Sequence, residues 1–399
     1  MMRGLCEGMD RFKPAMVLVV VQLLYVGIGI LYKLVVYDGM NLRVVIAYRF
    51  LFATAFMAPL AFIFERKKMP KMTWTILFQG LLCGLFGGML AQTLYLETLA
   101  LTTVTFTSAM TNLTPAATFV MAVFFGLEKL NLKTAGGKAK IIGTLTGISG
   151  AMILTLYKGA RIPTNSFHVT LLPPQHNHVA SSHYSPSHGN TLLGALCALG
   201  NIFSISLWLV VQGKMNQRFP CYYSSTTLMS FAASVFSVGF ALCTERDWSQ
   251  WKLGWNIRLL TVAYAGLVAS GFNVVMMAWC VSKGGPLFVS VFIPLQLLFL
   301  AFVGSFFLNE TLHLGSIIGG VLIVGGLYMV LWGKGKEMKK KDLLPASKTL
   351  HVSSSPSVDI IVKSSNVVNR DHQQGSSEIE NQAIPDGKNQ VASRNVSDT

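Results

Sequence analysis

Ten long apolar runs lie between residues 15 and 332 of this chain, and they constrain its fold more than any other feature. A helix that crosses a bilayer needs about 20 mostly apolar residues. Unpaired backbone groups are costly in lipid, so runs of this length are expected to be helices. The sequence therefore predicts an all-α polytopic membrane protein with ten transmembrane helices. We place them at Ala15–Val36, Val44–Phe64, Thr75–Leu99, Val104–Leu127, Ile141–Tyr157, Thr191–Val211, Ser224–Cys243, Leu259–Val281, Leu287–Leu308 and Gly315–Trp332.

Charged residues are scarce and unevenly placed. Asp, Glu, Lys and Arg make up 12% of the chain, against about 25% in soluble domains. The net charge of +15 would suit a nucleic-acid binder. Such proteins, however, gather Lys, Arg and aromatic residues on one solvated face, whereas these bases lie in short connections. We therefore predict contact with membrane lipid and none with nucleic acid.

The positions of the bases also predict the orientation in the membrane. With a cytosolic N-terminus, the cytosolic segments carry 19 Lys and Arg, and the opposite side carries seven. Lys and Arg concentrate on the cytosolic side of membrane proteins. We expect both termini in the cytosol of a multi-pass protein of the plasma membrane, with the vacuolar membrane as the alternative. The first run is followed by no clear cleavage site, so we expect it to be kept as the first helix.

Two segments interrupt the helical pattern. Residues 158–190 form a loop that contains Pro, Ser and five His, and the Ser-, Asn- and Gln-rich end of the chain is typical of disorder. The predicted organisation is a cytosolic N-terminus at 1–14, two five-helix repeats at 15–157 and 191–332, a non-cytosolic loop at 158–190 and a disordered cytosolic tail at 333–399.

No pattern in the sequence indicates catalysis or a bound metal. The six cysteines are scattered without a CxxC pair, and the histidines of the loop have no regular ligand spacing. A phosphate-binding glycine loop, a nucleophile elbow and a carboxylate pair are also missing from the sequence. We predict no cofactor, no metal and no enzymatic activity.

The second half of the chain repeats residues of the first half at a nearly constant separation. Each copy has an odd number of predicted helices, so the second copy enters the membrane inverted. Inverted repeats are a recurring design of transporters, which bind substrate near the midplane between the copies. The matching pairs are Lys33 with Lys214 (181 apart), Glu65-Arg66 with Glu245-Arg246 (180), Pro115 with Pro294 (179) and Glu128 with Glu310 (182).

Several segments resemble one family. They are Ala47-Tyr48-Arg49-Phe50, the run from Thr105 to Ala116 that contains Asn112 and Pro115, Phe203-Ser204-Ile205-Ser206-Leu207-Trp208, Glu245-Arg246-Asp247, and the glycine-rich segment Leu314–Lys334. With these motifs the chain resembles the plant nodulin-like, Walls-Are-Thin-related (UMAMIT) transporters, which carry two EamA domains and belong to the drug/metabolite transporter superfamily. The resemblance covers residues 10–335.

This resemblance implies a ten-helix bundle in which helices one to four and six to nine surround a central cavity, with five and ten at the periphery. Members carry amino acids, and some move auxin or related compounds. The chain departs from the family pattern at Thr98-Leu99-Ala100, where many members have Gly-Leu-Lys, and in its histidine-containing loop. Substrate identity is therefore not transferred closely.

Polar side chains deep in apolar runs are the candidates for substrate binding. Amides both donate and accept hydrogen bonds, which suits a ligand with an ammonium and a carboxylate. Hydrogen bonding between helices is the competing explanation. Pro115 and Pro294 free a backbone carbonyl, which can bind substrate or kink a helix. The predicted set is Gln22, Tyr25, Arg49, Gln92, Asn112, Pro115, Asn201, Trp208, Asn273, Pro294 and Gln296.

Two ionisable residues lie in the spans toward their non-cytosolic ends. Arg49 is expected to attract a carboxylate or to snorkel to the interface. Glu97 is the candidate for proton coupling, or it pairs with Arg49. Glu128 and Glu310 are expected to anchor helix ends beside bases. The pairs Gly143/Gly147 and Gly315/Gly319 favour close helix packing, either in a homodimer or within one chain.

The sequence thus predicts a transporter of amino acids or related small metabolites such as auxin, either a facilitator or a weakly proton-coupled carrier, that works by alternating access. A sugar-phosphate or nucleotide-sugar exchanger is a weaker alternative because phosphates require several bases. A non-transporting membrane receptor or scaffold would leave the inverted repeat without a purpose.

Overall fold

The first copy of the repeat folds into helices that follow its apolar runs. In the computed structural model, residues 2–67, 70, 72–128, 133–157, 161–162, 188–307 and 312–342 are described. The elements of the first copy are α1 (Met2–Tyr37), α2 (Leu42–Glu65), α3 (Trp74–Cys83), the π-helical η1 (Gly84–Leu90), α4 (Ala91–Leu101), α5 (Val104–Thr111), α6 (Thr114–Phe124) and α7 (Ala135–Leu156). Glu310, four of the five histidines of the loop and most of the predicted tail lie outside the described residues, and the fifth histidine, His188, is the first residue of α8.

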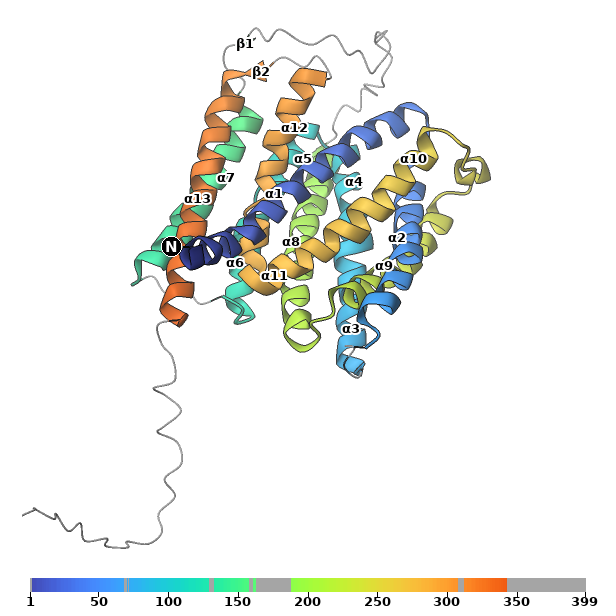
Figure 1. The fold of residues 1–399 in the computed structure, drawn as a ribbon. Helices are drawn as coiled ribbons and strands as arrows, with labels where there is room; N and C mark the ends of the chain where they lie inside the picture. The colour runs from blue at the N-terminus through green and yellow to red at the C-terminus, as the bar shows by residue number, and fades with distance from the viewer. Residues whose placement is uncertain are drawn as a thin grey trace, which may run out of the picture. The chain divides into compact units, whose positions relative to one another are not determined.

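The second copy repeats this order (Figure 1). It consists of α8 (His188–Arg218), α9 (Tyr222–Thr244), the short 3₁₀ helix η2 (Trp248–Trp251), α10 (Ile257–Tyr264), the π-helical η3 (Ala265–Phe272), α11 (Asn273–Ser290), α12 (Ile293–Phe307) and α13 (Leu314–Asp342). Two-residue strands, β1 (Arg161–Ile162) and β2 (Leu312–His313), pair antiparallel where the loop meets α13.

Eight helical stretches of the described residues are long and apolar enough to cross a membrane. A shorter apolar helix, Ile293–Val303, adds to them. Since each stretch satisfies its own backbone hydrogen bonds, the chain is an all-α polytopic membrane protein, as its sequence predicts. The count of ten helices stays a prediction, because the fourth and ninth apolar runs are each interrupted.

The interruptions fall at equivalent places in the two copies. Asn112 and Leu113 separate α5 from α6, and Val291 and Phe292 separate α11 from α12. Pro115 and Pro294 each occupy the second residue of the helix that follows. Proline lacks an N–H, and the first turn of a helix is where this loss costs least. The prolines therefore begin new helices, rather than kinking continuous ones as the sequence suggested.

Both copies also contain a π-helical segment, and the two segments start 181 residues apart. Glycines let each segment approach a helix of the other copy. A Cβ at Gly84 would lie 2.5 Å from Ala232 Cβ on α9, and one at Gly266 would lie 2.5 Å from Phe52 Cβ on α2. The inverted repeat is therefore present in the backbone geometry as well as in the sequence.

Helices α2 and α9 are joined at both ends by related contacts. At one end, Glu65 accepts hydrogen bonds from the backbone N–H groups of Tyr223 (3.0 Å) and Ser224 (2.7 Å), and so caps α9. At the other end, Glu245 accepts a hydrogen bond from the side chain of Asn41, the N-cap residue of α2. The repeated Glu-Arg motif thus marks two reciprocal contacts between helix ends.

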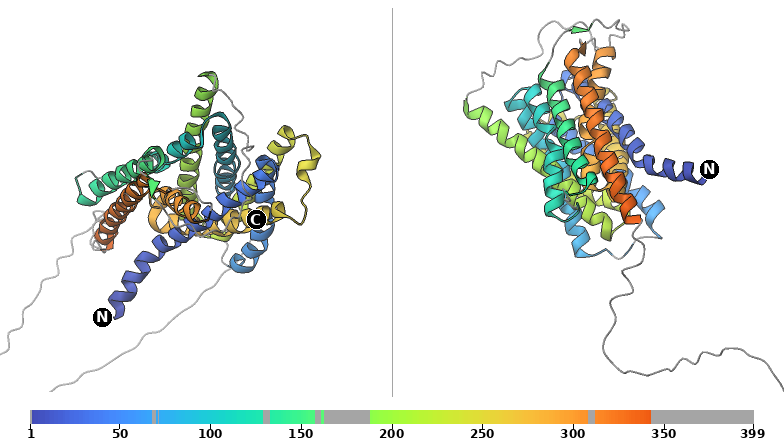
Figure 2. Two further views of the ribbon diagram at one scale, coloured as in Figure 1. Left: turned by 90° about the horizontal axis from the view of Figure 1, so that it is seen from above. Right: turned by 90° about the vertical axis from the view of Figure 1, so that its left-hand side faces the viewer.

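The peripheral pair consists of α7 and α13, which lie side by side at the edge of the bundle (Figures 1 and 2). A Cβ at Gly143 would lie 2.7 Å from the carbonyl oxygen of Gly326, and one at Gly319 would lie 2.5 Å from that of Gly150. The predicted glycine pairs are therefore used for packing within one chain. A homodimer stays a prediction, without support from these glycines.

A buried ion cluster fixes this peripheral pair to the end of α6. The carboxylate of Glu128 accepts a hydrogen bond from Lys140 Nζ on α7 at 3.2 Å and also pairs with Lys334 on α13. The side chain of Glu128 is 3% exposed and that of Lys140 is 1% exposed. Glu128 anchors a helix end beside bases, as its sequence context predicts.

Candidate functional site

A cavity of about 320 Å³ lies between the two copies. Residues from α1, α2, α4, α5, α8, α9, α11 and α12 line it, together with η1 and η3. Along α1 and α2 the lining runs from mid-helix toward the connection between them; we call this end of the bundle the α1–α2 end. Of the predicted residues, the cavity is lined by Gln22, Tyr25, Arg49, Gln92, Asn112, Asn201, Trp208 and Gln296.

Arg49 supplies the positive charge of this cavity. Its side chain is buried, and its guanidinium donates hydrogen bonds to Ser270 Oγ and, at 3.1 Å, to the hydroxyl of Tyr32. No carboxylate of the described residues lies within ion-pair distance of it. Arg49 therefore does not snorkel, and its neutral partners leave the charge available to an anionic ligand.

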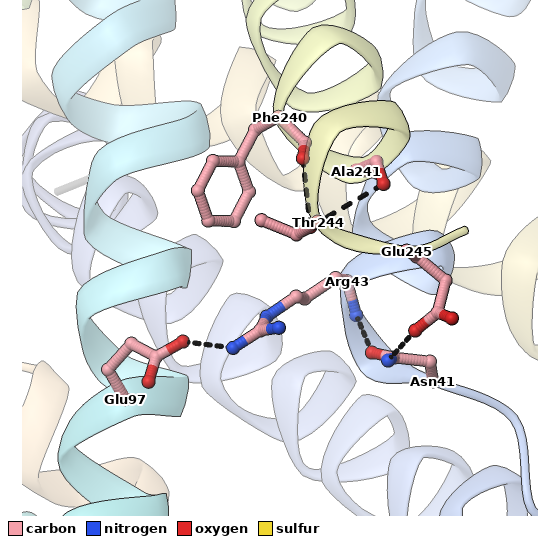
Figure 3. A network of polar contacts seen from close by, with 7 residues as sticks. All are labelled: Asn41, Arg43, Glu97, Phe240, Ala241, Thr244 and Glu245. Carbon is pink, nitrogen blue, oxygen red and sulfur yellow. Dashed lines mark hydrogen bonds and ion pairs between the residues drawn. The ribbon is translucent and has the colours of Figure 1, made fainter. Parts of the chain in front are cut away.

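Glu97 lies outside the cavity and does not pair with Arg49. Its carboxylate pairs with Arg43 in the first turn of α2, beside the contact between Asn41 and Glu245 (Figure 3). The two side chains of the ion pair are 34% and 31% exposed. Arg49 is six residues further along α2, about 9 Å deeper at 1.5 Å per residue. The predicted Glu97–Arg49 pair is therefore wrong. Glu97 and Arg43 lie at the α1–α2 end of the bundle, outside the cavity lining, and we call this place the rim.

Three glutamines of the lining have free hydrogen-bonding groups. Gln22, Gln92 and Gln296 make no side-chain hydrogen bond within the described part of the chain, although Gln22 is 2% exposed. Gln92 and Gln296 are half-buried, and amide groups that line a cavity in this way can both donate to and accept from a polar ligand. These side chains fit substrate binding better than interhelical bonding.

Other predicted residues make interhelical bonds instead. Asn201 Nδ2 donates to the carbonyl of Ala91 at 2.7 Å, and Asn112 Nδ2 contacts Thr155 Oγ1 at 3.4 Å. The hydroxyl of Tyr25 reaches the carbonyl of Ala269 at 3.4 Å. These three residues line the cavity and also hold helices together, so both explanations of their polarity apply.

Three predicted residues do not line the cavity. Pro115 and Pro294 begin the helices that follow the two breaks, close to lining residues but not among them. Asn273 is fully buried at the start of α11, and neither polar atom of its side chain has a partner in the described residues. Nothing in the structure explains the unpaired amide of Asn273.

The cavity also contains residues that the sequence did not predict. Tyr32, Tyr95, Ser108 and Ser270 line it. Tyr32 and Tyr95 stand near helix ends, where tyrosine usually marks the membrane interface. Ser270 belongs to η3, and the π-helical turn that places it beside Arg49 leaves no clear sequence pattern. The available signal for Tyr32 was its position seven residues, two helical turns, after the predicted Tyr25 on the same face of α1.

Comparison with known proteins identifies relatives. The EamA-like transporter family matches residues 13–156 and 192–332. WAT1-related protein At1g68170 of Arabidopsis thaliana is 48% identical over 327 residues, covering 82% of this chain and 91% of the relative. WAT1-related protein At1g25270 of the same plant is 45% identical over 327 residues, with the same coverage. A crystal structure with 15% identity shares the fold at a TM-score of 0.61, covering 80% of this chain and 97% of that one.

Proposed function

Because the chain belongs to the EamA-like family, as a WAT1-related membrane transporter of the drug/metabolite transporter superfamily, we propose that its substrate is a small metabolite with a carboxylate. Amino acids and related compounds such as auxin are the class that we favour. The substrate binds in the cavity between the two copies, and alternating access moves it across the membrane.

The buried guanidinium of Arg49 is the observation that carries this proposal. In a bilayer a charged side chain is costly and needs a functional or structural reason. Arg49 contacts neutral hydroxyls, so its charge lacks a carboxylate among the described residues. A substrate carboxylate would supply the missing negative charge and form a bidentate pair with the planar guanidinium. The free glutamine amides and the tyrosine rings around it suit the remainder of a small amphipathic molecule.

The lining also favours uncoupled transport. Among the residues that line the cavity, Arg49 is the one Asp, Glu, Lys, Arg or His. Glu97, the predicted coupling residue, is at the rim in an ion pair with Arg43. Proton coupling would require a group that gains and loses a proton during the cycle, and the described lining contains no carboxylate for this. We therefore propose a facilitator.

Flux measurements in oocytes test substrate and mechanism together. Cells that express the chain are offered a panel of labelled amino acids and auxin, and uptake and efflux are compared with those of uninjected cells. We expect flux of at least one compound, and we expect it to persist when the pH gradient is removed. If none of the compounds is transported although the protein is present at the cell surface, the proposed substrate class is contradicted. Flux that collapses with the gradient would contradict the uncoupled mechanism.

We also propose a plasma-membrane location with both termini in the cytosol. The excess of Lys and Arg in the corresponding connections supports this orientation. An epitope at the C-terminus is expected to be reached by antibody only after the cells are permeabilised. An epitope in the 158–190 loop is expected to be reached in intact cells. The reverse pattern would overturn the orientation, and labelling of the vacuolar membrane alone would overturn the location.

A further inference from the structure

A second cavity, of about 280 Å³, lies at the opposite end of the bundle, where α2 joins α3 and α8 joins α9. Its lining comes from α8, from the bend of α11 and from the ends of α6 and α13. The lining is polar at its mouth, where Gln217, Ser282 and Lys283 are located, and Gln217 and Lys283 are exposed. The transport site described above does not include any of these residues.

The inverted repeat relates this second cavity to the central one. Tyr32 lines the central cavity near the end of α1, and Gly213 lines the second cavity near the end of α8. They are 181 residues apart, the separation of Lys33 from Lys214 and of the starts of η1 and η3. Because the copies are inverted, equivalent positions face opposite ends of the bundle. The second cavity thus contains a position, Gly213, whose counterpart Tyr32 lines the central cavity toward the α1–α2 end.

One face of α8 passes through both cavities. Asn201, Ile205 and Trp208 line the central cavity, and Asn216 lines the second one. Gln212 is four residues from Asn216 and four from Trp208, so it lies between them on the same helix face. Trp208 and Gly213 are five residues apart, about 7.5 Å along the axis. On α11 the distance is similar, because Met277 and Val281 are four residues apart, about 6 Å.

The barrier between the cavities is therefore one to two helical turns thick. It contains fully buried residues of both helices, among them Leu209 and Cys280. Gln212 Nε2 donates to Asn216 Oδ1 at 2.9 Å, and Asn216 Nδ2 donates to the carbonyl of Ala278 on α11 at 2.7 Å. The first bond lies within α8, and the second joins α8 to α11 at the barrier.

The barrier also contains a polar group without a partner. Gln212 is 2% exposed, and its Oε1 accepts no hydrogen bond in the described part of the chain. Burying an acceptor without a donor disfavours the closed arrangement, whereas water or a passing ligand would satisfy it in an open one. An apolar residue would seal the same position better if the barrier were permanent.

We propose that the second cavity is the opposite vestibule of the transport pathway and that Gln212 and Asn216 form its gate. This proposal rests on the function proposed above for the central cavity. When α8 and α11 separate at the gate, the substrate carboxylate passes from Arg49 toward the vestibule, where the Lys283 ammonium attracts it. Gly285, which has φ of 83°, interrupts the helical backbone of α11 seven residues beyond Ala278.

A substitution that fills the vestibule should block transport of the substrate without preventing its binding in the central cavity. A Cβ at Gly213 would contact Pro286 Cγ at 3.2 Å and Leu127 Cδ1 at 3.3 Å, so Gly213→Leu occupies the cavity. We expect it to lower flux at least about tenfold while binding of the carried compound is kept, a split typical of a blocked step after binding. The matched control is Gly239→Leu, at an exposed position of α9 with nothing within 4 Å, which should leave flux unchanged. Flux of the Gly213→Leu protein within twofold of the wild type would overturn the proposal.

Thiol labelling tests the gate without any substrate. Gln212→Cys and Thr261→Cys both place a cysteine at a buried position, 2% and 0% exposed, but Thr261 on α10 is remote from the gate. A charged, membrane-impermeant thiol reagent is presented at the α2–α3 end, and labelling is counted above that of the native cysteines. We expect Gln212→Cys to react and Thr261→Cys to stay unreactive. If the two react equally slowly, the gate is refuted. Labelling of Gln212→Cys in a protein that carries none of the panel compounds would support the gate and reject the substrate class.

Discussion

Replacing Arg49 with glutamine is expected to abolish most transport of a carboxylate substrate while the protein still reaches the membrane. The substitution keeps hydrogen-bonding capacity toward Tyr32 and Ser270 but removes the charge. A hydrogen bond to a charged group contributes about 1.5–3 kcal/mol, which corresponds to roughly 10- to 150-fold in affinity. Flux of the labelled compound at low concentration is the measurement, normalised to the amount of protein at the surface.

Two further variants make this result specific. Arg49→Lys keeps the charge but loses the planar fork of donors, so an intermediate flux is expected. Arg43→Gln removes a cation of the rim, whose ion pair with Glu97 is about one-third exposed, so its effect should be small. If Arg49→Gln lowered flux no more than Arg43→Gln, the cavity would have to bind its substrate without this charge.

Replacing Glu128 with glutamine is expected to cause the largest loss of stability. Glu128 is nearly inaccessible to solvent, and its carboxylate contacts Lys140 and Lys334. Removing one member of a buried ion pair leaves uncompensated buried charge, which costs about 3–5 kcal/mol. The loss should appear as a lower unfolding temperature of the purified protein in detergent, and as a reduced amount at the cell surface.

The control for this stability prediction is Glu97→Gln. Its ion pair with Arg43 is partly exposed, and pairs of that kind contribute about 0–1 kcal/mol. Equal unfolding temperatures for the two variants would mean that the Glu128 cluster does not hold α7 and α13 to the end of α6.

The helices and the repeat could be predicted because they follow from local composition. A run of about 20 apolar residues indicates a helix that crosses the bilayer, and this holds regardless of which other helices it packs against. The common separation of Glu65-Arg66 and Glu245-Arg246 indicated equivalent helix ends, which the structure shows as reciprocal contacts between α2 and α9. The breaks before Pro115 and Pro294 were beyond the sequence, since a proline in the first turn of a helix and one that kinks it look alike in an apolar run.

The partners of Arg49 could not be predicted for a different reason. Tyr32, Arg49 and Ser270 come from α1, α2 and η3, and their contact depends on how three helices cross. The sequence gives the depth of a residue along its own helix but not its rotation relative to neighbours. Pairing with Arg49 was one of the two roles predicted for Glu97, because both residues lie toward the non-cytosolic ends of their spans. In the structure Glu97 pairs with Arg43, which precedes Arg49 on α2 by six residues, between one and two helical turns.

The pairing of α7 with α13 has a consequence for how the protein is made. Helix α13 starts at Leu314, 179 residues after the start of α7 at Ala135. At about 5–20 residues per second, the ribosome needs roughly 10–35 s to synthesise that stretch. Throughout this interval the glycine face of α7 has no α13 to cover it. In the same way, α2 lacks its packing partner α9 until the second copy is synthesised. The first copy must therefore be held in the bilayer by lipid or by the insertion machinery, and the fold closes only when the last helix is delivered.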